Sequence, residues 1–122
     1  MAHTIFIVED EPSLQFFYKE VLTHYGYQII GLANNGEEAV NMYKTLSKKP
    51  DIILMDHRLP LKTGMEATKE IMKLNNTPHI IFVSADETIK DEALNAGVCS
   101  FIHKPFNIDD LIENIEIVLN KS

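Results

Sequence analysis

The sequence predicts an α/β protein, with a doubly wound, five-stranded parallel sheet and five helices. One observation is that short, β-branched apolar runs alternate with amphipathic helical patterns along the whole 122-residue chain. The other is that four of the five runs are almost continuously apolar, as expected for parallel strands covered by helices on both faces. Five such units joined by right-handed crossovers most readily give the strand order 2-1-3-4-5.

The predicted strands, in chain order, are Thr4–Val8, Gln28–Ala33, Asp51–Met55, Ile80–Ser84 and Ser100–His103. Between and after them, apolar residues recur every three or four positions, which places one apolar stripe on each helix. These stripes fall within Leu14–Tyr25, Ala39–Leu46, Ala67–Leu74, Ile89–Ala96 and Ile108–Val118. Each apolar stripe gives its helix one face to pack against the sheet.

Three helix ends have sequence signals of their own. Thr63 and Glu66 have the spacing of a capping box, so we expect a helix to begin directly after Thr63. Asn107 is a favourable N-cap for the last helix, and Gly97 predicts a left-handed cap at the end of the fourth.

Composition excludes several classes of protein. With 122 residues, of which 45% are hydrophobic, the chain can form one core without disulfides, and we expect residues 1–122 to be a single domain without an output domain. The single cysteine, Cys99, lies among apolar neighbours that predict a buried side chain. A formal net charge of −7 argues against direct nucleic-acid binding. The chain has no signal-peptide pattern or membrane-length apolar run, so we expect a cytoplasmic protein with no membrane partner.

Acidic residues lie at the ends of the first and third predicted strands. Glu9 and Asp10 follow the first, and Asp56 follows the third. Strands one and three are neighbours in the predicted order, so these side chains should meet. Three carboxylates within about 5 Å repel by several kcal/mol, and a bound Mg²⁺ would relieve the repulsion. The alternative for Glu9 to Glu11 alone is a polar loop of helix-capping acids, a role that suits Glu11.

The fourth and fifth strands bring a hydroxyl and a cation to the same edge of the sheet. Ser84 ends the fourth strand, and Lys104 follows the fifth. Lys104 alone would be interpreted as a solvated surface lysine. The proline after it fixes the local backbone, and a bond before proline is the kind that can be cis.

Taken together, these residues resemble the receiver domains of two-component response regulators, the CheY-like proteins, over essentially the full chain. The resemblance rests on residues in the same order and on the same strands: Glu9, Asp10, Asp56, Pro60, Gly64, Ser84, Ala85, Lys104, Pro105 and Phe106.

The resemblance implies that Asp56 is the phosphoacceptor, which forms an aspartyl phosphate as a covalent intermediate. Lys104 would pair with the phosphoryl oxygens, and Ser84 would donate a hydrogen bond to one of them. Phe101 lies where receivers commonly have an aromatic switch residue, with plain core packing as the alternative. The phosphate would come from a sensor histidine kinase, a phosphotransfer protein or a small phosphodonor. The protein would be a signalling phosphoacceptor that catalyses its own phosphorylation and slow dephosphorylation, rather than a conventional enzyme.

For the metal, the resemblance implies that Asp10, Asp56 and the backbone carbonyl of Arg58 ligate Mg²⁺, or Mn²⁺ in its place, while Glu9 acts mainly through metal-bound water. Arg58 and Asp86 lie in loops that flank the acyl phosphate in receivers. We expect them to pair across it and to lengthen its lifetime, against the alternative that both side chains are simply solvated.

Three other functions fit the sequence less well. A flavodoxin-like redox protein has the same topology but needs a phosphate-binding loop where this chain has Glu-Asp-Glu-Pro. A haloacid dehalogenase-type phosphatase needs an aspartate where Arg58 stands. A degenerate receiver that binds partners without phosphorylation stays open, although the acidic set with Ser84 and Lys104 argues against it. The cognate kinase and the downstream protein target have no signature in the sequence.

Overall fold

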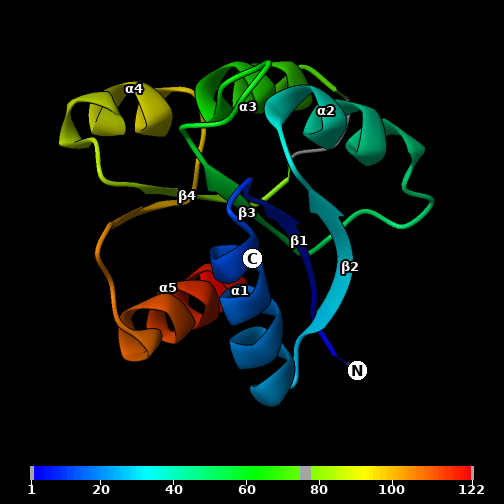
Figure 1. The fold of residues 1–122 in the computed structure, drawn as a ribbon, viewed down its shortest axis with the longest axis vertical. Helices are drawn as coiled ribbons and strands as arrows, with labels where there is room; N and C mark the ends of the chain where they lie inside the picture. Colours follow the sequence, from blue (N-terminus) through cyan, green and yellow to red (C-terminus); the bar gives the residue numbers. More distant parts are fainter. Residues whose placement is uncertain (1, 75–77, 122) are drawn as a thin grey trace.

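The central sheet has five parallel strands in the order β2-β1-β3-β4-β5, which confirms the predicted fold class (Figure 1). The computed structural model describes residues 2–74 and 78–121. The strands are β1 (Thr4–Val8), β2 (Gln28–Ala33), β3 (Ile52–Asp56), β4 (Ile80–Ser84) and β5 (Ser100–His103). Every residue of β1, β3 and β4 is buried. This burial explains their continuous apolar runs, because helices cover both faces of these strands.

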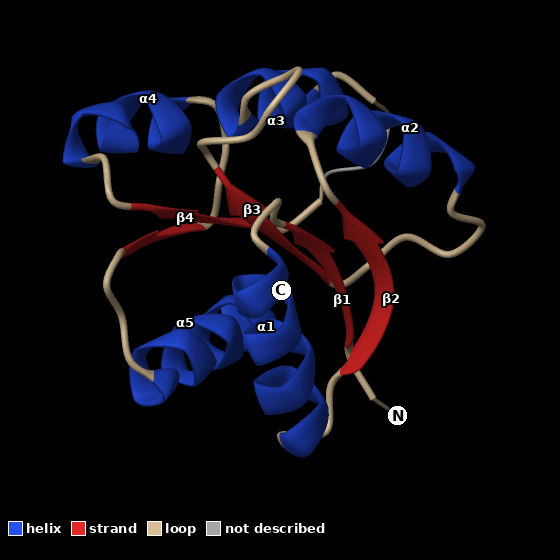
Figure 2. Cartoon of the chain, viewed as in Figure 1, coloured by secondary structure: helices blue, strands red, loops and turns tan. Residues whose placement is uncertain are grey.

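Two layers of helices enclose the sheet (Figure 2). Helices α1 and α5 cover one face, and α2, α3 and α4 cover the other. The bounds are α1 (Pro12–His24), α2 (Gly36–Thr45), α3 (Gly64–Met72), the 3-10 turn η1 (Glu87–Ile89), α4 (Lys90–Asn95) and α5 (Ile108–Lys121). Within the described residues, none of these helices combines the length and apolar character needed to span a membrane.

The predicted helix ends are confirmed. Thr63 and Glu66 form a complete capping box at the start of α3. Asn107 accepts a hydrogen bond from the backbone N–H of Asp110 at 2.8 Å, so it caps α5. Gly97 has a φ angle of +108°, the left-handed conformation that ends α4 at low cost only for glycine.

Three boundary predictions are corrected. Strand β3 begins at Ile52 and includes Asp56. Asp51 lies before the strand, where its side chain accepts a hydrogen bond from the backbone N–H of Thr4 at 2.8 Å. Helix α3 ends at Met72, and Leu74 packs on the core from outside the helix. The apolar stripe of the predicted fourth helix begins at Ile89, but Ile89 belongs to η1, so α4 is shorter than predicted.

Cys99 is exposed, so the prediction of a buried side chain is wrong. The preceding residue, Val98, takes the buried position at 6% exposure. The backbone N–H of Cys99 donates to the carbonyl of Ile80 at 2.8 Å, which fixes the approach to β5.

Candidate functional site

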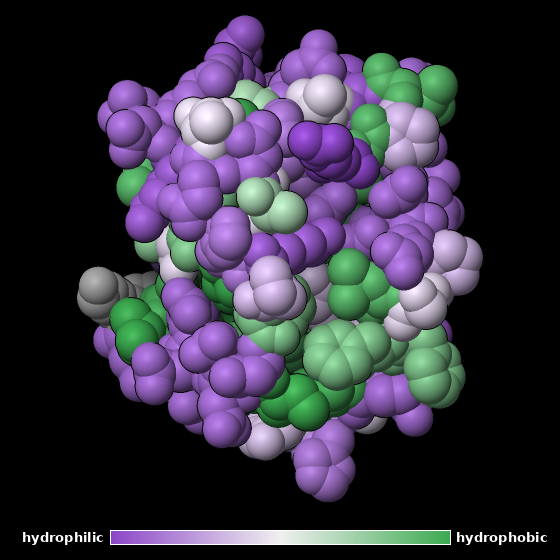
Figure 3. Space-filling model, turned by 60° about the vertical axis from the view of Figure 1, so that its left-hand side comes forward, coloured by the Kyte–Doolittle hydropathy of each residue, from purple (hydrophilic) through white to green (hydrophobic). Residues whose placement is uncertain are grey.

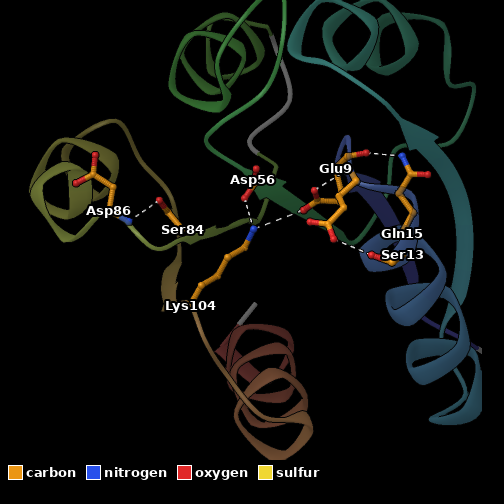
Figure 4. Close-up of polar contacts among 8 residues, drawn as sticks. Glu9, Ser13, Gln15, Asp56, Ser84, Asp86 and Lys104 are labelled. Atoms are coloured by element: carbon orange, nitrogen blue, oxygen red, sulfur yellow. Dashed lines mark hydrogen bonds and ion pairs between the residues drawn. The ribbon is translucent and has the colours of Figure 1, made fainter.

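The predicted site residues meet at the carboxyl ends of the strands, as Figure 4 shows for most of them. Asp56 is the last residue of β3 and Ser84 the last of β4. Glu9 follows β1, and Lys104 follows β5 with its side chain directed at Asp56. The sheet order explains this meeting, because β1 and β4 flank β3 and β5 flanks β4.

Three carboxylates form the acidic cluster, which we define as Glu9, Asp10 and Asp56. One oxygen from each lies within 4.8 Å of the others. Glu9 and Asp56 are 2% and 6% exposed, whereas Asp10 is exposed. The buried Oε1 atom of Glu9 has no hydrogen-bond partner among the described residues. A buried carboxylate oxygen that accepts no hydrogen bond is costly, so the cluster favours a bound cation.

Burial shifts the pKa values of Glu9 and Asp56. Burial first, and then the charge of Asp56, raises the pKa of Glu9 to about 7. Burial also raises the pKa of Asp56, although the hydrogen bond and charge of Lys104 act in the opposite direction. For Lys104 itself, burial lowers the pKa, but hydrogen bonding and charge from Asp56 outweigh it, so the net shift is upward.

Lys104 supplies the cation of the site. Its Nζ donates to Oδ1 of Asp56 at 2.7 Å and lies 3.7 Å from Oε1 of Glu9. When all three carboxylates are ionised, they and the one ammonium carry a formal charge of −2. A divalent cation that prefers carboxylate oxygens would balance this charge, so the residues present fit Mg²⁺.

The loop after β1 is held by contacts that the sequence analysis missed. Gln15, one turn into α1, donates through Nε2 to the backbone carbonyl of Glu9 at 2.5 Å and to Oδ1 of Asn34 at 2.8 Å. The backbone N–H of Glu11 donates to Oε2 of Glu9 at 3.1 Å. These bonds fix the backbone and one carboxylate oxygen of Glu9, while its Oε1 is left to face the acidic cluster.

Ser84 and Asp86 are linked in the loop after β4. The buried Oγ of Ser84 accepts the backbone N–H of Asp86 at 3.0 Å, so its own hydroxyl proton is available for another acceptor. The carboxylate of Asp86 accepts the backbone N–H of Thr88 at 3.0 Å and its hydroxyl at 2.5 Å. The hydrogen bonds from Thr88 also lower the pKa of Asp86. Asp86 therefore caps η1, a role that its spacing to Thr88 could have indicated.

Arg58 and Phe101 were also predicted to belong to the site, and both lie outside the acidic cluster. Arg58 and Asp86 form no ion pair in the structure, which describes both side chains. Phe101 is partly buried and stacks on Phe82, with ring centroids 6.2 Å apart and an angle of 18° between the rings. Phe101 therefore packs against the core, as the alternative predicted, and its switch role stays a prediction.

Gly64 holds the loop after β3 close to Asp56. Its N–H donates to the carbonyl of His57 at 2.9 Å, and an added Cβ would lie 2.0 Å from the backbone oxygen of Asp56. We expect Gly64→Ala to lower the free energy of unfolding by about 3 kcal/mol, because the backbone of Asp56 cannot move away from the added methyl group as a flexible side chain could. The control, Gly26→Ala, has φ +90° and open space, and should cost about 1–2 kcal/mol. Urea unfolding measures both, and an unchanged stability of Gly64→Ala would contradict the prediction.

Comparison with known proteins identifies the family. The sequence pattern of the response regulator receiver domain matches residues 5–116. The chain therefore belongs to the response regulator receiver family and is a receiver domain of two-component signalling systems. The chemotaxis protein CheY of Thermotoga maritima is similar to it, with 39% identity over 97% of this chain and 98% of the relative.

Two solved structures show the same fold. A receiver domain of a sensor histidine kinase from Pseudomonas aeruginosa, solved with a magnesium ion coordinated in the active site cleft, is 30% identical with a TM-score of 0.87, over 98% of this chain and 99% of that one. The CheX-CheY-BeF3-Mg complex from Borrelia burgdorferi contains a chain that is 28% identical with a TM-score of 0.90, over 95% of this chain and 88% of that one.

The raised pKa of Glu9 predicts that the free energy of unfolding depends on pH. A bound metal ion should remove this dependence. Folded chains keep the Glu9 proton up to pH about 7, whereas unfolded chains release it near 4.5. Without metal, the free energy of unfolding should therefore fall between these pH values, by up to about 3 kcal/mol. Urea unfolding should show a weaker fall in Glu9→Gln. Mg²⁺ should stabilise the protein more at pH 8 than at pH 5, and much less in Asp10→Asn. Equal pH dependence in Glu9→Gln and the native protein would contradict this.

Proposed function

We propose that the protein is a phosphoacceptor switch in which Asp56 takes a phosphoryl group from a sensor histidine kinase, a phosphotransfer protein or a small phosphodonor. The observation that carries the proposal is the buried Asp56, hydrogen-bonded to Lys104 and grouped with Glu9 and Asp10. The alternative of a phosphorylation-independent module is not needed, because the acidic cluster, Lys104 and Ser84 lie at one edge of the sheet. We infer a cytoplasmic location, a downstream protein target and no direct nucleic-acid binding.

The reaction would be a phosphoryl transfer. A carboxylate oxygen of Asp56 attacks phosphorus, a new P–O bond forms, and the bond to the donor breaks with its electron pair leaving on the donor. Lys104 opposes the rise in the pKa of Asp56 and so acts to keep the nucleophile ionised. Its ammonium, and the unused hydroxyl proton of Ser84, lie beside the position of the new phosphoryl oxygens. Catalysis would therefore come from positioning and charge neutralisation by the chain itself.

Divalent metal fits the acidic cluster. Asp10, Asp56 and the backbone carbonyl of Arg58 would hold Mg²⁺, or Mn²⁺ in its place, with Glu9 acting through metal-bound water. The bound metal would supply positive charge against the phosphoryl oxygens. Support comes from the excess negative charge of the cluster and from the buried Oε1 of Glu9, which accepts no hydrogen bond from the described residues.

Phosphoryl uptake tests the proposal. Incubation with acetyl phosphate and Mg²⁺ should add one phosphoryl group per chain, detected as a discrete increase in intact mass. Omission of Mg²⁺ should slow the uptake strongly. A chain that stays unmodified at saturating donor and metal would contradict the proposed function.

The lifetime of the phosphoryl group should depend on Arg58 and Asp86. We propose that they pair in the phosphorylated state and restrict the access of water, with Asp86 still capping η1. Arg58→Ala and Asp86→Ala should each speed dephosphorylation about two- to fivefold, as loss of an exposed ion pair allows, and the double variant should be little faster. Thr88→Ala is the control, because it loses the hydroxyl bond to Asp86 but keeps the backbone cap bond and the charge of Asp86. Unchanged rates in the single variants, or additive effects in the double one, would contradict the pairing.

A further inference from the structure

A buried tyrosine next to the acidic cluster has no part in the chemistry described so far. Tyr18, from α1, is 2% exposed. Its hydroxyl is buried and has no hydrogen-bond partner among the described residues. Burial and then the charges of Glu9 and Asp56 raise the pKa of this phenol. The side chain therefore lies within electrostatic reach of both carboxylates and remains neutral.

The ring of Tyr18 contacts the segment that carries Lys104. It stacks on Phe106 with centroids 6.2 Å apart and an angle of 3° between the rings. Phe17 completes an aromatic cluster, with its centroid 6.0 Å from Tyr18 and 6.4 Å from Phe106. Parallel stacking on a fully buried ring gives Phe106 a fixed support from α1.

The backbone of this segment has one further anchor near the site. The N–H of Lys104 donates to the carbonyl of Ser84 at 2.9 Å. Pro105 is exposed and has no N–H to donate. The backbone that carries Lys104 is therefore held by its bond to β4 on one side and by the packing of the Phe106 ring on the other.

Open space beside Lys104 makes this support necessary. A groove of about 450 Å³ lies against it, with an otherwise apolar lining: Leu14, Phe17, Ala85, Pro105 and Phe106. Figure 3 shows apolar side chains gathered on the lower half of this side of the molecule, where α1 and α5 lie. A long, flexible lysine next to such a groove would lose its alignment with Asp56 if Phe106 moved.

We propose that Tyr18 is a positioning residue, whose ring holds Phe106 and thereby keeps the ammonium of Lys104 directed at Asp56. This inference rests on the proposed function, since the alignment matters for phosphoryl transfer. The plain alternative is that Tyr18 only fills the core between α1 and the sheet. The two differ in whether the effect of Tyr18 passes through Lys104.

Phosphorylation rates with acetyl phosphate and Mg²⁺ separate these possibilities. Tyr18→Phe keeps the stacking ring and should react within about twofold of the native rate. Tyr18→Leu should react about tenfold more slowly, because small misplacements of a catalytic group are costly. Tyr43→Leu is the matched control, since Tyr43 is 1% exposed in the core of the other face, and it should keep the native rate. All rates are measured well below each variant's melting temperature, so that lost stability alone cannot slow them.

A second background tests the route of the effect. In Lys104→Met, the change Tyr18→Leu should cause no further loss of rate, because the group that it positions is gone. A tenfold loss that persists in that background would overturn the proposal. So would a native rate in Tyr18→Leu, an equal loss in Tyr43→Leu, or a tenfold loss in Tyr18→Phe.

A measurement without phosphate keeps the inference distinguishable from the proposed function. In urea unfolding, Tyr18→Leu and Lys104→Met together should lower the midpoint by less than the sum of their separate effects. Additive effects would overturn the positioning role even if the native protein took no phosphate. If Tyr18→Leu does not fold, Phe106→Leu replaces it, with the same expected results in rate and in urea.

Discussion

Lys104→Met should slow the phosphorylation of the chain by acetyl phosphate about 10²- to 10³-fold, the usual cost of removing one preorganised charge from a site of developing negative charge. The Nζ of Lys104 is 2.7 Å from Oδ1 of Asp56, the proposed phosphoacceptor. Methionine keeps most of the length and volume of the lysine side chain and removes its charge. The pKa of Asp56 should rise further in this variant, because the group that opposes its upward shift is lost. Rates measured across pH should therefore show the onset of reactivity at higher pH than in the native protein.

Lys62→Met provides the control for this result. The Lys62 side chain is 26% exposed, as is that of Lys104, and it forms an ion pair with Glu70 instead of Asp56. We expect Lys62→Met to react at the native rate with an unchanged pH profile. If the two lysine variants lost activity to the same extent, the special role of Lys104 would be refuted.

Much of the site could be predicted because parallel topology places strand ends together. Asp56 lies far from Glu9 and Asp10 in the sequence, yet the order β2-β1-β3 makes their meeting necessary once the strands are recognised. The same argument brings Ser84 and Lys104 to that edge. The strand signals were strong because fully buried strands need continuous apolar runs, which polar loops interrupt clearly.

The remaining features depend on contacts that a sequence pattern does not encode. Tyr18 and Gln15 occupy ordinary helical positions, and only the packing of α1 places one under Phe106 and the other against the loop after β1. Cys99 looked apolar in context, but the alternation of side chains before β5 gives the buried position to Val98. Carboxylate repulsion could be foreseen, but the rise in the pKa of Glu9 comes first from the burial of its side chain, which the sequence does not show.

The most direct measurement of the central claim is to locate the phosphoryl group. The chain is incubated with acetyl phosphate and Mg²⁺, the acyl phosphate is reduced with borohydride, and the modified residue is identified by peptide mass spectrometry. The account predicts one modified residue per chain, Asp56 converted to homoserine, and no phosphoryl uptake in Asp56→Asn. Full modification of the Asp56→Asn protein, or a native product modified at Asp10 or Glu9 with Asp56 intact, would contradict it.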